Sequence, residues 1–225
     1  MFRGGARFQP SEIYVGTGKS FKKIKNQAFD RDAKYEDVDA AALDFDGDGD
    51  LDLYVVSGGN EHKVQSKELE DRLYLNDGKG NLKRLPLSLP HTNGGSIATG
   101  DFDGDGFDDL FIGGRSIPGF YGLAPFSYIL RNKGGFGLEL VKKERYGMIT
   151  DSKWADYDQD GDLDLIYCGD WTPISVLENT GARNFKFRSA DLGLINTGGL
   201  WNSICLLYTS PSPRDRTRSR MPSSA

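Results

Sequence analysis

The chain of 225 residues is poor in histidine and cysteine, with two of each. Two cysteines, Cys168 and Cys205, do not make a disulfide framework. His62 and His91 lie near no serine or cysteine nucleophile signature, so both are predicted to be solvated loop residues rather than general bases. No apolar run is long enough to span a bilayer, and the first residues lack the apolar segment of a signal peptide.

Glycine and aromatic residues, by contrast, are abundant. The chain has 29 glycines, and 12% of its residues are aromatic, against 37% hydrophobic residues in total. This composition suits one globular domain, or part of a larger one, built from short strands that glycine-rich turns connect. We therefore expect an all-β fold.

The last 21 residues, CLLYTSPSPRDRTRSRMPSSA (205–225), differ in composition from everything before them. Ser, Pro and Arg replace Asp, Gly and aromatics, which is typical of a disordered tail. The letters also resemble a translated DNA-sequencing adapter. We predict that this segment is a non-native, disordered tail, and we leave it out of the fold prediction.

The net charge of the whole chain is −5. Without the four arginines and one aspartate of the tail, residues 1–204 have 24 basic and 32 acidic residues, a net charge of −8. An acidic chain of this kind is not expected to bind nucleic acid electrostatically.

An acidic motif occurs three times, as DFDGDGDLDL (44–53), DFDGDGFDDL (101–110) and DYDQDGDLDL (156–165). The starts are 57 and 55 residues apart. A strand-like segment precedes each copy, an apolar run follows it, and an Asn- and Gly-containing hairpin comes next. Units of four short strands at this period predict the blades of a β-propeller.

The chain is expected to be an arc of such a ring, beginning and ending within a repeat. FRGGA (2–6) matches FIGGR (111–115), and Ser203-Ile204 match Ser96-Ile97. The predicted parts are a partial blade at 1–30, blades at about 37–90, 94–148 and 149–193, the start of another at 198–204, and the tail at 205–225.

Each acidic loop carries oxygen ligands at positions 1, 3, 5, 7 and 9, counted from its first aspartate, and glycine at position 6. Carboxylates at positions 1, 3 and 5 converge when the chain turns sharply at the glycine, position 7 contributes its backbone carbonyl, and position 9 closes the site. The predicted ligands are Asp44, Asp46, Asp48, Asp50 and Asp52; Asp101, Asp103, Asp105, Phe107 and Asp109; and Asp156, Asp158, Asp160, Asp162 and Asp164. We expect three Ca²⁺ sites.

Three other interpretations are less favoured. An EF-hand requires glutamate at position 12 and flanking helices, but Val55, Ile112 and Tyr167 stand there, in β-prone runs. Mg²⁺ prefers fewer carboxylates and more waters. A simple polar turn could explain a single copy of the motif, but it explains less well three copies with aspartate and glycine at the same positions.

The motif followed by an apolar strand and Gly-Gly resembles the FG-GAP/VCBS repeat of integrin-α-type β-propellers, and FIGGRSIPG (111–119) is close to its namesake motif. GGRSIPGFYGLAPFSYILRN (113–132) and GDWTPISVLEN (169–179) are similar to bacterial secreted proteins of the cartilage-acidic-protein type, which often carry an ASPIC/UnbV domain; no such segment is visible in this sequence. The resemblance implies a ring of about seven blades and an extracellular, periplasmic or cell-surface location. Gln159 at position 4 departs from the motif, but not at a ligand position.

The resulting hypothesis is a non-catalytic, calcium-stabilised scaffold for adhesion or binding, whose partner is an unknown protein or glycan. The alternative is the propeller domain of a secreted carbohydrate-active enzyme. Two long connections, at 57–71 and 114–126, are candidate partner sites, although their residues are more simply interpreted as fixing the loop against its blade. Trp154, Trp171 and Trp201 recur near strands, so all three are expected to pack in the fold.

Overall fold

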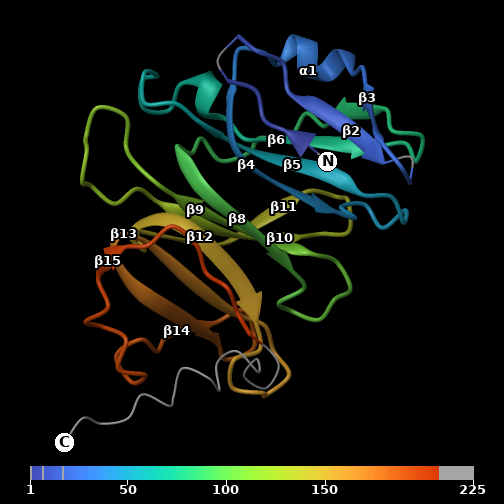
Figure 1. Ribbon diagram of the computed structural model, residues 1–225. Helices are drawn as coiled ribbons and strands as arrows, with labels where there is room; N and C mark the ends of the chain where they lie inside the picture. Colours follow the sequence, from blue (N-terminus) through green and yellow to red (C-terminus); the bar gives the residue numbers. More distant parts are fainter. Residues whose placement is uncertain (1, 7, 17, 208–225) are drawn as a thin grey trace, which may run out of the picture.

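The computed structural model describes residues 2–6, 8–16 and 18–207, and these form four antiparallel β-sheets stacked one after another along the chain (Figure 1). Sheet 1 contains β1 (Phe2–Arg3), β2 (Glu12–Gly16) and β3 (Phe21–Ile24). Sheet 2 contains β4 (Glu36–Leu43), β5 (Asp52–Gly58), β6 (Arg72–Asn76) and β7 (Leu82–Arg84). Sheet 3 contains β8 (Gly94–Gly100), β9 (Asp109–Gly114), β10 (Ser127–Asn132) and β11 (Leu138–Glu144). Sheet 4 contains β12 (Met148–Ala155), β13 (Asp164–Asn179), β14 (Phe185–Phe187) and β15 (Gly199–Leu200).

Helix is almost absent from the described residues. It is confined to α1 (Gln27–Arg31) and a 3₁₀ turn, η1 (Lys67–Leu69). No described helix is long and apolar enough to cross a membrane. The expected all-β class is therefore confirmed, and the stack of antiparallel sheets is of the kind that builds a β-propeller.

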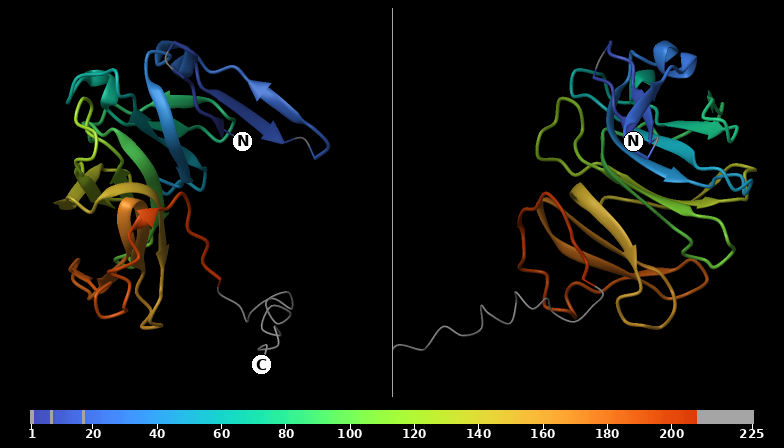
Figure 2. Two further views of the ribbon diagram at one scale, coloured as in Figure 1. Left: turned by 60° about the vertical axis from the view of Figure 1, so that its left-hand side comes forward. Right: turned by 45° about the vertical axis from the view of Figure 1, so that its right-hand side comes forward.

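The first strands of sheets 2, 3 and 4 lie side by side. β4 packs beside β8, and β8 packs beside β12. From these strands each sheet extends outward, and Figure 2 shows the same stack from two further sides, with sheet 1 at one end and sheet 4 at the other. The three acidic loops follow these neighbouring strands, so the fold brings all three to the same edge of the stack.

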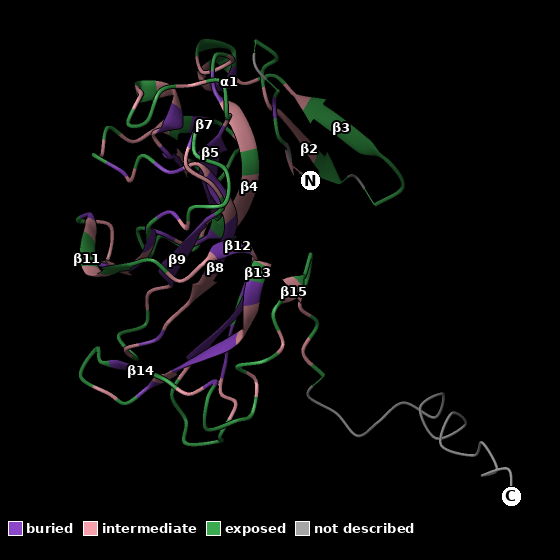
Figure 3. Ribbon diagram, turned by 90° about the vertical axis from the view of Figure 1, so that its left-hand side faces the viewer, coloured by how far each residue is buried: buried purple, intermediate pink, exposed green. Residues whose placement is uncertain are grey.

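The middle strands are buried on both faces because sheets cover them from both sides. Along β5, Leu53 and Val55 contact the cluster shared with sheet 1, whereas Tyr54 and Val56 contact the cluster shared with sheet 3. This alternation follows from the period of two residues in a strand. Figure 3 shows the buried residues concentrated within the stack. Burying an aliphatic or aromatic side chain stabilises the fold by about 1.5–3 kcal/mol, so the sheets depend on one another.

Sheet 4 departs from the predicted four separate strands. β13 runs without interruption for 16 residues and pairs with β12 through its first half and with β14 through its second. The strand turns at Trp171, which has φ of 50° and is 57% exposed. The prediction that Trp171 packs in the fold is therefore wrong, because the left-handed corner turns the side chain away from the sheet. Trp154 is buried as predicted, and Trp201 is 39% exposed.

Side chains on the first strands join neighbouring sheets by hydrogen bonds. The amide of Ile97 in sheet 3 donates to Asp39 Oδ2 in sheet 2 over 3.0 Å. The amide of Ile204 donates to Asp151 Oδ2 of sheet 4 over 2.8 Å, and Ser203 Oγ donates to the same oxygen. Residues 203–204 therefore lie against sheet 4 as residues 96–97 lie against sheet 2.

The predicted tail at 205–225 falls mainly on residues 208–225, which lie outside the described residues. Residues 205–207 have no regular secondary structure. Leu206 packs with Leu194 and Ile204 against the outer face of sheet 4, at Ile166 and Val176.

One carboxyl group is fully enclosed at the start of β6. Asp71 is 0% exposed and accepts hydrogen bonds from the amide of Ser57, the hydroxyl of Thr92 and the hydroxyl of Tyr54. Burial raises the pKa of Asp71 to about 7, against the lowering effect of these donors and of Arg72.

Replacing Asp71 by Asn should flatten the dependence of stability on pH. A carboxyl whose folded pKa of about 7 exceeds its unfolded pKa stabilises the fold below about pH 4, and this contribution is lost as the pH rises towards 7. The free energy of unfolding, measured by urea denaturation in chelator from pH 4 to 8, should fall less steeply in Asp71→Asn than in the unchanged protein. Asp30→Asn, at an exposed carboxylate of α1, is the charge-matched control; parallel curves for the unchanged protein and Asp71→Asn would refute the assignment.

Candidate metal centres

The acidic loops connect the first strand of a sheet to its second, at residues 44–51, 101–108 and 156–163. Position 6 has positive φ in every loop, at 90° in Gly49, 92° in Gly106 and 98° in Gly161. Glycine takes this left-handed conformation without steric cost. Position 4 is left-handed as well, and in the third loop it is Gln159, with φ of 65°.

The position-1 aspartate holds the turn closed from within. In the first loop, Asp44 Oδ1 accepts from the amide of Gly47 over 2.9 Å and Oδ2 from that of Gly49 over 3.0 Å. In the second and third loops, Asp101 and Asp156 accept from the amides at positions 5 and 6, over 2.9–3.2 Å. Position 5 also accepts from the amide of position 7 in all three loops. The loops therefore share one backbone arrangement.

The position-9 aspartates are buried at the first residue of the second strand and are 0–1% exposed. In sheet 3, Asp109 Oδ2 accepts from the amide of Phe102 over 3.2 Å and Oδ1 from that of Asn132 over 2.8 Å. Asp52 and Asp164 make the equivalent pairs of bonds. Asp52 and Asp109 thus tie their loops to the third strand of their own sheet, whereas Asp164 ties its loop to Asn179 at the far end of β13.

Burial raises the pKa of these carboxyls. The pKa of Asp109 rises to about 7 and that of Asp164 to about 6, mainly through burial, with further contributions from loop aspartates. The amide donors oppose the rise. The pKa of Asp52 is raised for the same main reason. A site that disfavours its own negative charge is one that a cation would stabilise.

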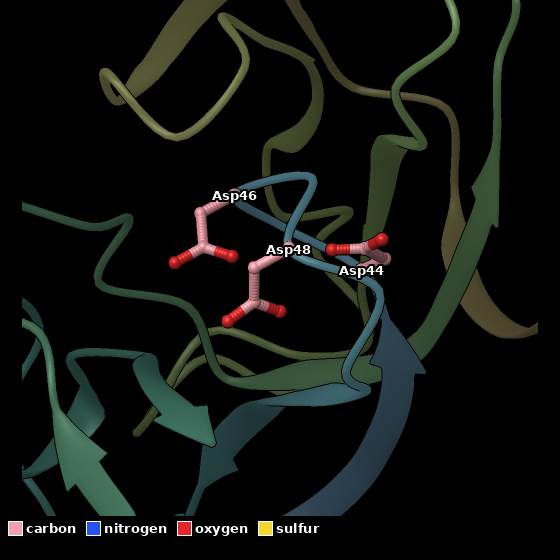
Figure 4. Close-up of side chains that lie close together, drawn as sticks. All are labelled: Asp44, Asp46 and Asp48. Atoms are coloured by element: carbon pink, nitrogen blue, oxygen red, sulfur yellow. The ribbon is translucent and has the colours of Figure 1, made fainter. Parts of the chain in front are cut away.

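Carboxylate oxygens from three side chains of each loop come within 4.8 Å of one another. The groups are Asp44, Asp46 and Asp48; Asp101, Asp103 and Asp109; and Asp156, Asp158 and Asp164. Figure 4 shows the three carboxylates of the first group gathered around one turn of the chain. Of the predicted side-chain ligands, Asp52, Asp105 and Asp160 lie outside these groups, as do the side chains of Asp50 and Asp162. The carbonyl ligands predicted at position 7, including that of Phe107, stay a prediction.

The donor set fits a hard divalent cation. All the grouped atoms are carboxylate oxygens, the ligands that Ca²⁺ prefers. Asp103 Oδ1 is buried without a hydrogen-bond partner, so this oxygen is free to accept a ligand. A carboxylate oxygen retains lone pairs for a metal even where it already accepts a backbone amide.

Sequence reasoning missed the asparagines that join the first and second loops to the next sheet. Asn132 Nδ2 of sheet 3 donates to the carbonyl of Phe45 in the first loop over 2.9 Å, and both residues are buried. Asn179 Nδ2 of sheet 4 donates to the carbonyl of Phe102 in the second loop over 2.7 Å. The repeated asparagine in the hairpins is the available signal, but its sequence context indicates only a turn residue.

Two arginines at the second loop were also missed. Arg131 contacts Asp103 and Asp105, and Arg183 lies 3.4 Å from Asp103. The first and third loops have no arginine or lysine paired to a loop carboxylate among the described residues. The three loops are therefore alike in backbone but not in charge.

The two long connections lie at the other end of the second strands from the acidic loops. They meet through Asn93, whose Nδ2 lies 2.7 Å from both Asn60 Oδ1 and Ser116 Oγ. On this surface Tyr121 is 85% exposed, and its ring lies edge-on to Trp171 at 5.6 Å.

The histidines differ from each other. His91 is exposed, as predicted, and its Nδ1 lies 3.1 Å from the carbonyl of Ser66. His62 is half-buried, with Nε2 enclosed and without a hydrogen-bond partner. The solvated position predicted for His62 is therefore wrong.

Comparison with known families gives one result, on the first two acidic loops. Residues 44–112, from the first loop through most of β9, match the FG-GAP-like repeat. No curated protein matches the chain.

Proposed function

We propose that the protein is a calcium-binding scaffold whose acidic loops each bind one Ca²⁺. The observation that supports this most directly is the threefold recurrence of one loop geometry with converging carboxylates, within and beside the segment that matches the FG-GAP-like repeat. Three to four carboxylates per site favour Ca²⁺ over Mg²⁺, which keeps more of its waters. Extracellular calcium modules work with dissociation constants of about 10⁻⁴–10⁻³ M.

Calcium in these loops would act on the packing between sheets. The ligands at positions 1 and 9 lie at the ends of two adjacent strands, so an ion between them fixes their spacing. The first and second loops also accept hydrogen bonds from the next sheet, at Phe45 and Phe102. An ordered loop therefore keeps its neighbouring sheet in place.

The proposed role is non-catalytic and lies outside the cytosol, where calcium is abundant enough to fill weak sites. Partner binding belongs to the surface opposite the acidic loops, where Tyr121 and Trp171 are exposed. Exposed aromatic side chains provide contact area for a protein or a glycan. The partner itself is not assigned.

Replacing the position-1 aspartate of one loop should remove one calcium site. Calorimetric titration of the full chain is expected to detect three ions for the unchanged protein and two for each of Asp44→Asn, Asp101→Asn and Asp156→Asn. Asparagine keeps the size of the side chain and one acceptor but removes the charge that the ion requires.

Asp170→Asn is the control, since Asp170 pairs with Arg115 at the opposite end of the sheets. Its stoichiometry should stay at three. A titration in which none of the five proteins releases or absorbs heat with calcium, and none changes its melting temperature, would rule out the proposed function.

A further inference from the structure

The second acidic loop already contains a cation supplied by the chain. Arg131, the residue before Asn132 at the end of β10, places Nε 2.5 Å from Asp103 Oδ2 and Nη2 2.5 Å from Asp105 Oδ2. The side chains of Arg131 and Asp103 are 19% and 12% exposed. Hydrogen bonds between two charged groups in such a site are short and strong. The guanidinium therefore holds one oxygen from each of two predicted calcium ligands.

The other two loops provide an internal comparison. The residue before the hairpin asparagine is Leu75 in sheet 2 and Glu178 in sheet 4. Leu75 packs against the core between sheets 2 and 3. Glu178 pairs with Arg188 and accepts from the hydroxyl of Tyr157. Among the described residues, only the second loop has a guanidinium on positions 3 and 5.

A second arginine extends this arrangement to the next sheet. Arg183, in the hairpin of sheet 4, lies 3.4 Å from Asp103 Oδ2 through Nε and 3.7 Å from Glu139 through Nη1. Glu139 lies on β11 of sheet 3, 3.8 Å from Arg131. Two arginines and two acids thus connect sheets 3 and 4 at the place where the asparagine bond from Asn179 also joins them.

A guanidinium at this position has two consequences for the loop. It offsets the repulsion among the loop carboxylates, whereas among the described residues the first and third loops have no paired guanidinium to do so. It also competes with calcium, because it occupies ligand oxygens and because like charges at contact distance repel each other.

We propose that Arg131 is an internal cation of the second loop, which keeps this loop folded without calcium and makes it the weakest of the three calcium sites. The expected difference in affinity is about tenfold. The order of affinities rests on the proposed calcium function, whereas folding of the loop without calcium does not. In chelator, sheets 3 and 4 would then stay joined while the first loop loosens from sheet 3.

Hydrogen exchange at three equivalent amides tests the first part. Gly49, Gly106 and Gly161 each donate to the position-1 aspartate of their own loop. In EDTA, exchange should be at least about tenfold slower at Gly106 than at the other two glycines.

Two variants of Arg131 remove the guanidinium. Arg131→Leu, which reproduces the residue at position 75, should bring the exchange rate of Gly106 to that of Gly49. Arg131→Gln, which keeps a polar chain of similar length, is the second variant. Arg115→Leu, at the other end of β9, should leave all three rates unchanged.

Calcium titration of the same variants tests the second part. The unchanged protein should give two tighter sites and one weaker site, and Arg131→Leu should tighten the weaker one by about tenfold. Equal exchange rates at the three glycines in EDTA would show that Arg131 does not order the second loop. Three equal calcium affinities in the unchanged protein would show that the second loop is not the weakest site. If no variant binds calcium, the proposed function and the ranking both fail, while the rates in EDTA still decide whether Arg131 orders the loop.

Discussion

Saturating calcium is expected to raise the melting temperature of the full chain by roughly 10–20 °C over its value in EDTA. An ion that binds only the folded state stabilises it by about 2.7 kcal/mol per site at a hundredfold excess over the dissociation constant. Two sites of this strength contribute about 5 kcal/mol, and each kcal/mol shifts the melting temperature of a domain of this size by about 2–4 °C. Differential scanning calorimetry in EDTA and in 10 mM calcium measures the shift.

Magnesium at the same concentration is the matched control, and its effect should be much smaller because the loops offer more carboxylates than Mg²⁺ prefers. The triple variant Asp44→Asn, Asp101→Asn, Asp156→Asn should melt at one temperature with and without calcium. A calcium effect that survives in this variant would place the ions outside the acidic loops.

Asp109→Ala is expected to destabilise the protein by about 2–6 kcal/mol in EDTA, before any effect on calcium. Its carboxylate is 0% exposed and accepts from the amides of Phe102 and Asn132. Without it, both donors are left unpaired in the interior, at about 1–3 kcal/mol each. Urea denaturation in EDTA measures the loss.

Asp108→Ala is the adjacent control for this change. Asp108 is half-buried, and burial together with the nearby Asp101 and Asp44 raises its pKa. Removing its charge should change the free energy of unfolding by less than about 0.5 kcal/mol, or stabilise the protein slightly. Equal losses of unfolding free energy in Asp108→Ala and Asp109→Ala would mean that the charge of the loop affects stability and that the hydrogen bonds of the position-9 carboxylate do not.

The acidic loops could be located from the sequence because their determinants are local. Aspartate at positions 1, 3 and 5 and glycine at position 6 fall within six residues, and the structure gives all three loops the same backbone. The local pattern did not indicate that position 4 is also left-handed. Gly47 and Gly104 occupy position 4 in the first two loops, and glycine there does not reveal that the backbone must be left-handed. Gln159, whose φ is 65°, shows this requirement in the third loop.

The contacts between sheets could not be predicted in the same way. Asn132 is 87 residues from Phe45, and Arg131 is 28 residues from Asp103. Both contacts depend on how β10 pairs with β9 and on how sheet 3 packs against sheet 2, which the spacing of one motif does not specify. The same limit applies to Trp171, where a strand-like sequence contains a left-handed corner.

Counting the calcium ions bound to one chain tests the central claim most directly. Native mass spectrometry of the full chain, sprayed from buffer with calcium at saturating concentration, should give a main species with three ions, and two ions for Asp156→Asn. A chain that carries no calcium under these conditions, or the same number before and after the substitution, would contradict the account.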